Sequence, residues 1–395
     1  DVGSGKTVVA AALCHTVIRN GYQTVMMAPT EILAAQHYQS LSGLFEKSGI
    51  RTALLTGFTS AAEKKKIKSE LSQGNIDFII GTHALIQDDV TFQNLGLVVT
   101  DEQHRFGVAQ RTALTAKGKN PHMLVMSATP IPRTLALIIY GDLDISLLDE
   151  LPPGRQPIAT FAVGQDKHTR IYNYIKKFLD QGRQGYIVCP LIEDNGNDLT
   201  PAQEYYKKLA DEVFGNYRLG LLHGKMKATE KDAVMDAFSK NQIQLLVSTT
   251  VIEVGVDVPN AVIIVIENAE RFGLSQLHQL RGRVGRGKCP STCILVSDAQ
   301  NQQTIARLKI MTQTNNGFEI ADEDLKLRGP GDFFGSRQHG LPDLKIADLY
   351  NDSEILYQTQ TAARKLLTKD PDLSLPEHTD LRQEVETLFK STGTI

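Results

Sequence analysis

Short apolar runs alternate with helix-length stretches over the first 126 residues of the chain. Each run is bounded by polar or turn-forming residues, which is typical of a buried β-strand. The predicted strands cover residues 24–28, 52–55, 78–80, 97–99 and 123–126. Helix-length stretches at residues 31–47 and 60–72 lie between strands. This alternation predicts a mostly parallel sheet that is covered by helices on both faces.

A break at residues 150–157, which read ELPPGRQP, separates this half from a second one. Because proline and glycine interrupt all periodicity there, we predict an interdomain linker at residues 151–157. A second series of predicted strands covers residues 158–163, 186–189, 219–222, 245–248, 262–266 and 293–296. We therefore expect an α/β fold with two tandem parallel-sheet domains, residues 1–150 and 158–300, although the halves share no sequence repeat.

The alternation stops after Asp298, and residues 301–395 form a predicted C-terminal region of helices and loops. Residues 302–313 predict a helix, and residues 318–332 predict another that ends at a glycine. The stretch Phe333–Gly340 is rich in glycine and aromatic residues and contains the pair Arg337-Gln338. Composition alone would assign this stretch to a surface loop.

The formal charge of −3 and the pI near 6.4 exclude a generally basic nucleic-acid coat, but not a polyanion held in a local groove. The longest apolar runs, such as residues 261–266, are too short to cross a bilayer, and no charged-then-apolar leader precedes the first motif. We therefore expect a cytoplasmic protein. The cysteines at 14, 189, 289 and 293 lack clustered partner ligands, so we expect buried free thiols and no zinc site.

The first seven residues, DVGSGKT, match all but the opening glycine of the phosphate-binding signature G-x-x-x-x-G-K-[ST]. In that signature the backbone amides, here those of Gly3, Ser4 and Gly5, surround a nucleotide phosphate. The lysine, Lys6, reaches the β- and γ-phosphates, and the hydroxyl of Thr7 is a ligand of Mg²⁺. The following apolar run suits a helix whose N-terminus faces the phosphates. The alternative is a glycine-rich turn that occurs by chance.

Asp101 and Glu102 directly follow the predicted strand at 97–99. Ligands of parallel α/β sheets bind at the carboxyl ends of strands, where this pair would lie. Together with a P-loop, such a pair can hold Mg²⁺ through Asp101 and orient an attacking water through Glu102. Acidic residues at this position are otherwise common as solvated turn residues.

The stretch at residues 276–287, QLHQLRGRVGRG, places three arginines among glycines. Interior glycines cost a helix about 1 kcal/mol each, so we expect a functional reason for the pattern. One reason is an arginine finger, a guanidinium that meets the γ-phosphate from across a cleft. The alternative is a general phosphate or nucleic-acid patch.

The motifs DVGSGKT, APTEILAAQH, TG, GTHAL, DEQH and SAT occur in the order found in superfamily-2 helicases, which the chain resembles. The resemblance implies RecA-like domains and coupling roles for Ser127 and Thr129. It also places a set of residues along the nucleic-acid strand: Pro29, Thr30, Thr56, Gly57, Thr82 and His83. Hydroxyls and free backbone amides suit phosphate contacts that read no bases. We interpret the run Lys64–Lys66 as a solvated helix face.

The second half resembles helicase motifs V and VI. The resemblance places Arg283 and Arg286 as fingers and Gln279 at the nucleotide. It implies strand contacts by Thr249 and Thr250, and coupling of the ribose or finger by Asp257, although Asp257 can also be read as structural. This half has no second P-loop.

Residues 318–340, together with DEQHRFGVAQR and SATPIPRTLAL, resemble the RecG family of helicases, and in related form the transcription-repair coupling factor. The resemblance implies a translocation element with coupling roles for Arg337 and Gln338. In this family a wedge domain precedes the motor, and we expect it to lie outside this chain, which starts within the P-loop.

The implied function is an ATP- and Mg²⁺-dependent DNA helicase that unwinds forks and four-way junctions in recombination and repair. The implied protein is a monomer, with a single-strand-binding protein as an additional partner. Two alternatives remain open: a nucleotide-gated nucleic-acid clamp that does not translocate, and the motor of a coupling factor.

Overall fold

The structure, a computed structural model, describes residues 1–102, 106–128, 144–150, 152, 155–190, 201–249, 257–328 and 353–391. The predicted site residues Thr129, Thr250, Arg337 and Gln338 lie outside these ranges. Contacts group residues 1–130 with 148–320 in one compact unit, and residues 131–147 with 321–395 in another.

The first sheet of the larger unit is parallel throughout, with the strand order β2-β3-β1-β4-β5. Its strands are β1 (Gln23–Met27), β2 (Thr52–Leu55), β3 (Phe78–Gly81), β4 (Leu95–Thr100) and β5 (His122–Val125). Each overlaps a strand predicted from an apolar run, which confirms the parallel α/β fold of this half.

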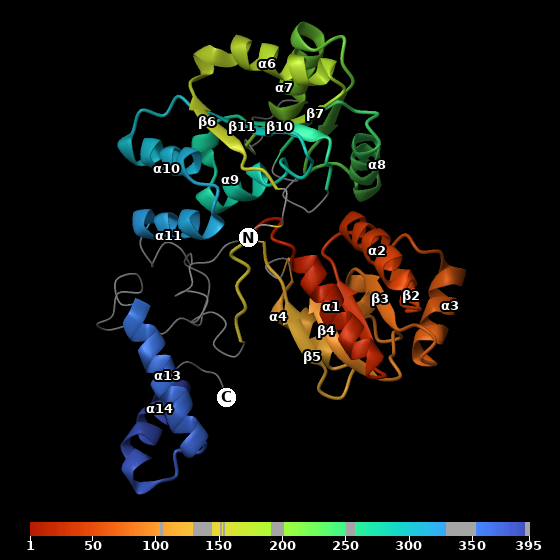
Figure 1. Cartoon of the computed structure of the whole chain (residues 1–395), viewed down its shortest axis with the longest axis vertical. Helices are drawn as coiled ribbons and strands as arrows, with labels where there is room; N and C mark the ends of the chain where they lie inside the picture. Colours follow the sequence, from red (N-terminus) through yellow and green to blue (C-terminus); the bar gives the residue numbers. More distant parts are fainter. Residues whose placement is uncertain are drawn as a thin grey trace. The chain divides into compact units, whose positions relative to one another are not determined.

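Helices cover both faces of this sheet, as Figure 1 shows. They are α1 (Lys6–Arg19), α2 (Glu31–Glu46), α3 (Ala61–Ser72), η1 (His83–Ile86) and α4 (Val108–Thr115). Successive side chains of a strand point to opposite faces. Met26 therefore packs with α1 and α2, whereas Val25 and Met27 pack with α3, η1 and α4. The predicted helix at 31–47 begins where expected because the Thr30 side chain accepts a hydrogen bond from the Leu33 amide.

The second sheet of the same unit is also parallel, with the order β6-β11-β10-β7-β9-β8. Its strands are β6 (Ala159–Val163), β7 (Gln184–Val188), β8 (Leu219–Leu222), β9 (Leu245–Ser248), β10 (Ala261–Ile266) and β11 (Thr292–Val296). The helical elements of this half are η3 (Gln165–Lys167), α6 (His168–Asp180), α7 (Pro201–Lys208), η4 (Leu209–Val213), α8 (Ala228–Ser239), η6 (Ala269–Arg271), α9 (Leu274–Arg281) and α10 (Gln302–Gln313). The next helix, α11 (Gly317–Arg328), begins in this unit, and its residues 321–328 belong to the smaller one. One face of α6 packs on the sheet because Ile171, Ile175 and Leu179 recur at helical spacing.

The smaller unit contains α13 (Ser353–Lys369), η7 (Pro376–His378) and α14 (Thr379–Ser391) among its described residues. The carboxylate of Asp370 accepts hydrogen bonds from the amides of Ser374 and Leu375 and from His378 Nδ1, at 2.7–3.0 Å. This carboxylate therefore fixes the turn between α13 and η7.

Three of the four cysteines, Cys14, Cys189 and Cys293, are buried free thiols as predicted. Cys289 is only half-buried, because it lies in the turn before β11 and not in a sheet. Among the described residues, no helix combines the length and the apolar character that crossing a membrane requires.

Candidate nucleotide and nucleic-acid site

The strands of the first sheet end in register at one edge. Gly81 lies opposite both Leu55 and Met27, and Thr100 lies opposite both Met27 and Val125. The residues that follow these strands are therefore neighbours along one carboxyl edge. They are Pro29 and Thr30 after β1, Thr56 and Gly57 after β2, Thr82 and His83 after β3, Asp101 and Glu102 after β4, and Ser127 after β5.

The predicted P-loop forms a tight turn into α1, which begins at Lys6. Gly3 and Gly5 have φ values of 67° and 90°, in the left-handed region that favours glycine. The Lys6 ammonium and the Ser4 hydroxyl both donate to the carbonyl of Asp1, at 2.5 and 2.9 Å. The backbone thus curves around the Lys6 side chain, as a phosphate-binding loop must.

Lys6 lies within electrostatic range of the acidic pair at the end of β4. Burial lowers the pKa of Lys6, whereas Glu102 and then Asp101 act in the opposite direction. The structure therefore brings together the lysine and the two carboxylates that sequence motifs assigned to one site.

Asp101 is held by a partner that the sequence analysis did not identify. Its carboxylate lies 2.8 Å from Nε2 of His37, which comes from α2, and both residues are buried. A hydrogen bond of this kind fixes the orientation of a carboxylate. In the sequence, His37 was visible only as the last residue of the APTEILAAQH motif.

Glu102 adopts φ 52°, an uncommon value for a residue with a side chain. Such a conformation costs about 1–2 kcal/mol and occurs preferentially at functional positions. The Ala128 amide donates to Glu102 Oε2 at 3.5 Å, which links the DEQH motif to the SAT motif after β5.

The three arginines of the glycine-rich stretch have different surroundings. Arg281 is 2% exposed and donates to the carbonyls of Met311 and Thr314, at 2.8 and 2.9 Å, so it anchors α9 to the end of α10. Arg283 is also buried, and burial together with Arg286 lowers its pKa to about 10.

Arg286 contacts Asp257, the residue that the resemblance assigns to coupling of the ribose or finger. Its Nη1 lies 3.6 Å from Asp257 Oδ1, and its Nε donates to the Gly282 carbonyl at 2.9 Å. Gln279, the remaining nucleotide candidate of this stretch, is 8% exposed.

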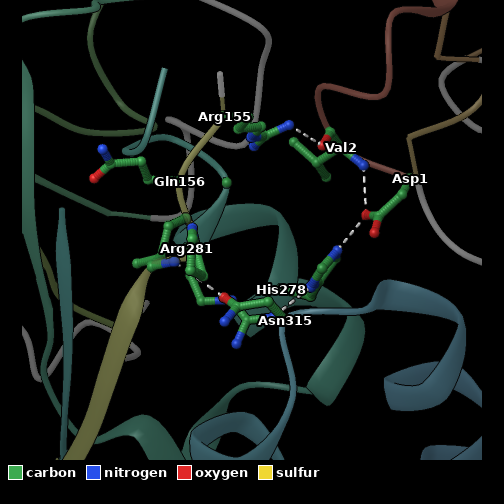
Figure 2. Close-up of a pocket in the computed structure, with 10 residues that line it drawn as sticks. Asp1, Val2, Arg155, Gln156, His278, Arg281 and Asn315 are labelled. Atoms are coloured by element: carbon green, nitrogen blue, oxygen red, sulfur yellow. Dashed lines mark hydrogen bonds and ion pairs between the residues drawn. The ribbon is translucent and has the colours of Figure 1, made fainter. Parts of the chain in front are cut away.

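Figure 2 shows a small pocket where the P-loop meets α9 and the end of the linker. Asp1 Oδ1 accepts a hydrogen bond from His278 Nε2 at 2.5 Å, and the Val2 carbonyl accepts one from Arg155 at 2.5 Å. Burial and the adjacent Arg281 lower the pKa of His278 to about 3. The imidazole is therefore neutral near pH 7, with Nδ1 accepting from Arg281 at 3.0 Å.

These contacts around the P-loop were not anticipated from the sequence. His278 was visible only as a member of the motif VI stretch, and Arg155 only as part of the predicted linker. A Cβ on Gly282 would meet Val2 at 2.5 Å, which accounts for a glycine at that place. The P-loop thus contacts both the linker and motif VI.

The predicted strand-contact residues differ in exposure, and Pro29 and Thr30 are half-buried. Thr56, Thr82 and Thr249 are 2–5% exposed, whereas Gly57 and His83 are exposed. The Gly57 amide, predicted to be free for phosphate, donates instead to Glu31 Oε1 at 2.9 Å. Lys65 and Lys66 are exposed, as a solvated face requires, but Lys64 is half-buried.

Family models match most of the chain. The model for DEAD/DEAH box helicases matches residues 1–138, the helicase conserved C-terminal domain matches 167–288, and the C-terminal part of domain 3 of the ATP-dependent DNA helicase RecG matches 314–394.

The chain is 52% identical to the ATP-dependent DNA helicases RecG of Synechocystis and of Bacillus subtilis, over 97% and 98% of its length. It covers 46% and 57% of those proteins, so it spans about half the length of these relatives. A solved structure of RecG bound to a three-way DNA junction superposes with a TM-score of 0.76 at 51% identity, covering 90% of this chain and 46% of that one. Dbp5 of S. cerevisiae, at 18% identity and a TM-score of 0.56 over 83% of this chain and 82% of that one, shares the fold.

Proposed function

The chain belongs to the RecG family of ATP-dependent DNA helicases, and on this premise we propose that it is the motor of an enzyme that unwinds branched DNA. The motor would move along duplex DNA and drive branch migration of four-way junctions and reversal of forks. The observation that carries the proposal is that Asp101 and Glu102, which follow β4 at the carboxyl edge of the first sheet, lie within electrostatic range of the P-loop lysine Lys6. The relative of known structure is bound to a three-way junction, which supports branched DNA as the substrate.

The residues at this edge fit ATP with Mg²⁺, because they combine a phosphate-binding loop with hydroxyl and carboxylate oxygens. Lys6 would bind the β- and γ-phosphates next to the Gly3, Ser4 and Gly5 amides. Thr7 and Asp101 would hold the metal ion, which neutralises phosphate charge when bound. Glu102 would orient the attacking water, and the His37 hydrogen bond would keep Asp101 in place.

Arg283, Arg286, Asp257 and Gln279 would complete the nucleotide site from the second sheet, with Arg286 as the main finger. Hydrolysis would then shift the strand-contact residues, through Ser127 and Thr129 and through Arg337 and Gln338. The family also implies a monomer in the cytoplasm and a single-strand-binding protein as a partner; these rest on the resemblance.

ATP turnover in the presence of linear, forked and four-way DNA tests this function. We expect branched DNA to stimulate turnover and to be unwound. Stimulation without unwinding would favour the nucleotide-gated clamp, and stimulation by no DNA would rule out the motor. The match of residues 314–394 to RecG domain 3 supports this family over the coupling factor.

Replacing Glu102 with glutamine keeps the shape of the side chain but removes the charge that orients water. We expect ATP to bind with nearly unchanged affinity while kcat falls by about 10²–10⁴-fold, the usual contribution of a general base. Nucleotide affinity and single-turnover hydrolysis should be measured on the same preparation. Glu70→Gln, at a side chain of α3 that is 40% exposed, is the matched control. Near-normal turnover in Glu102→Gln would leave Glu102 as a strand-end residue.

Replacing Arg337 with alanine should separate hydrolysis from movement. A planar guanidinium can exchange partners between two arrangements, which a coupling element requires. We expect DNA-stimulated ATP hydrolysis to remain while junction unwinding falls by at least about tenfold. Loss of both activities in parallel would assign Arg337 to folding or to the nucleotide site, and full unwinding would make the stretch a surface loop.

A further inference from the structure

The side chain of Glu31 joins three segments of the carboxyl edge that are far apart in the sequence. Glu31 lies at the start of α2, directly after Pro29 and Thr30. Its Oε1 accepts a hydrogen bond from the Gly57 amide at 2.9 Å and another from the Thr82 hydroxyl at 3.1 Å. One carboxylate oxygen therefore connects the segments that follow β1, β2 and β3.

Gly57 is held from both sides. While its amide donates to Glu31, its carbonyl accepts from the Lys64 ammonium at 2.9 Å. A Cβ at position 57 would lie 3.0 Å from Glu31 Oε1, so the backbone approaches the carboxylate closely. The half-buried position of Lys64, unlike that of its exposed neighbours, follows from this contact.

Thr82 is fixed in the same way. It is 2% exposed, and its hydroxyl donates to Glu31 and faces away from solvent. The residue after it, His83, is exposed at the surface of the same loop. Hydrogen bonds to an ionised acceptor are roughly twice as strong as neutral ones, so the carboxylate holds both loops more firmly than an amide would.

A carboxylate at this position would repel a nucleic-acid phosphate, so direct binding of the strand does not explain why a glutamate is found at position 31. We propose that Glu31 is a positioning residue that sets the spacing of the strand-binding loops after β2 and β3 relative to the start of α2. The inference rests on the proposed DNA-motor function, because it assumes that these loops bind the strand. Loops preset at the spacing of successive phosphates lose less entropy when the strand binds.

The test is to titrate ATP turnover with a four-way junction and to measure basal turnover and the KM for ATP without DNA. For Glu31→Ala we expect the half-maximal DNA concentration to rise about tenfold, as loss of a charge-assisted hydrogen bond predicts. Basal kcat and the KM for ATP should stay within about twofold, because the hydrogen bonds of Glu31 go to the loops after β2 and β3. Glu31→Gln, which keeps an acceptor oxygen for both donors but loses the charge, should raise the half-maximal DNA concentration less than Glu31→Ala does. Glu46→Ala, at the exposed end of the same helix, is the matched control.

A double variant tests whether Glu31 acts through Thr82. If Glu31 acts partly through Thr82, then Glu31→Ala combined with Thr82→Ala should raise the half-maximal DNA concentration less than the product of the single effects. A wild-type titration curve for Glu31→Ala, or equal damage by Glu31→Gln and Glu31→Ala, would overturn the inference while leaving the motor function in place. A parallel loss of basal turnover and thermal stability would also overturn it by assigning Glu31 to folding. Wild-type protein that no DNA stimulates would overturn both proposals.

Discussion

Replacing Lys6 with alanine should remove ATP turnover, with a fall of at least about 10³-fold, because preorganised charge at the transferring phosphoryl group supplies most of the catalysis in such sites. Lys6 lies on the first turn of α1, and its ammonium is already enclosed by the loop, where it donates to the Asp1 carbonyl. It is the only lysine of α1, so no neighbouring ammonium on that helix can replace it.

Nucleotide affinity of Lys6→Ala should be measured by calorimetry together with steady-state turnover. Lys66→Ala is a matched control, because the Lys66 side chain is 73% exposed on α3 and only weakly paired with Glu70. Wild-type nucleotide affinity in Lys6→Ala would count against the assignment of residues 1–7 as a phosphate-binding loop.

Replacing Arg286 with alanine should lower kcat by about 10³–10⁵-fold, the range that arginine fingers contribute. The dissociation constant of ATP should change little, by less than about threefold, if the guanidinium acts mainly in the transition state. Arg286 suits this role because its guanidinium is held at two points, by the Gly282 carbonyl and by Asp257.

The comparison of kcat with ATP affinity should include Arg271→Ala, an exposed arginine of η6 in the same half of the unit. The DNA affinity of both variants should be measured as well. Unchanged kcat with weakened DNA binding would show that the glycine-rich stretch is a nucleic-acid patch and not a finger.

The sequence by itself determined the α/β fold and predicted where the nucleotide chemistry is located. Residues 261–266 are all apolar, as a strand buried on both faces of a parallel sheet must be, and β10 occupies that run. Lys6 and the pair Asp101-Glu102 were identified because each follows a local rule: a glycine-rich loop before a helix, and acidic residues where a strand ends. Local rules of this kind need no knowledge of distant residues.

The resemblance to motif VI separated Arg283 and Arg286 from Arg281, but only the tertiary structure showed what each arginine contacts. Spacing along the chain does not determine those contacts. Arg281 meets carbonyls at the end of α10, whereas Arg286 meets Asp257, and both partners come from other segments of the chain.

The residues that hold the site in place could not be identified from the sequence for the same reason. His37 and Asp101 are 64 positions apart, and Glu31 and Thr82 are 51 positions apart. A hydrogen bond between such residues leaves no periodic or compositional trace, because it depends on the order of strands in the sheet. The sequence therefore identified the groups proposed to act on the nucleotide, while the packing of β1, β3 and β4 side by side decided which side chains hold those groups and the neighbouring strand-binding loops in place.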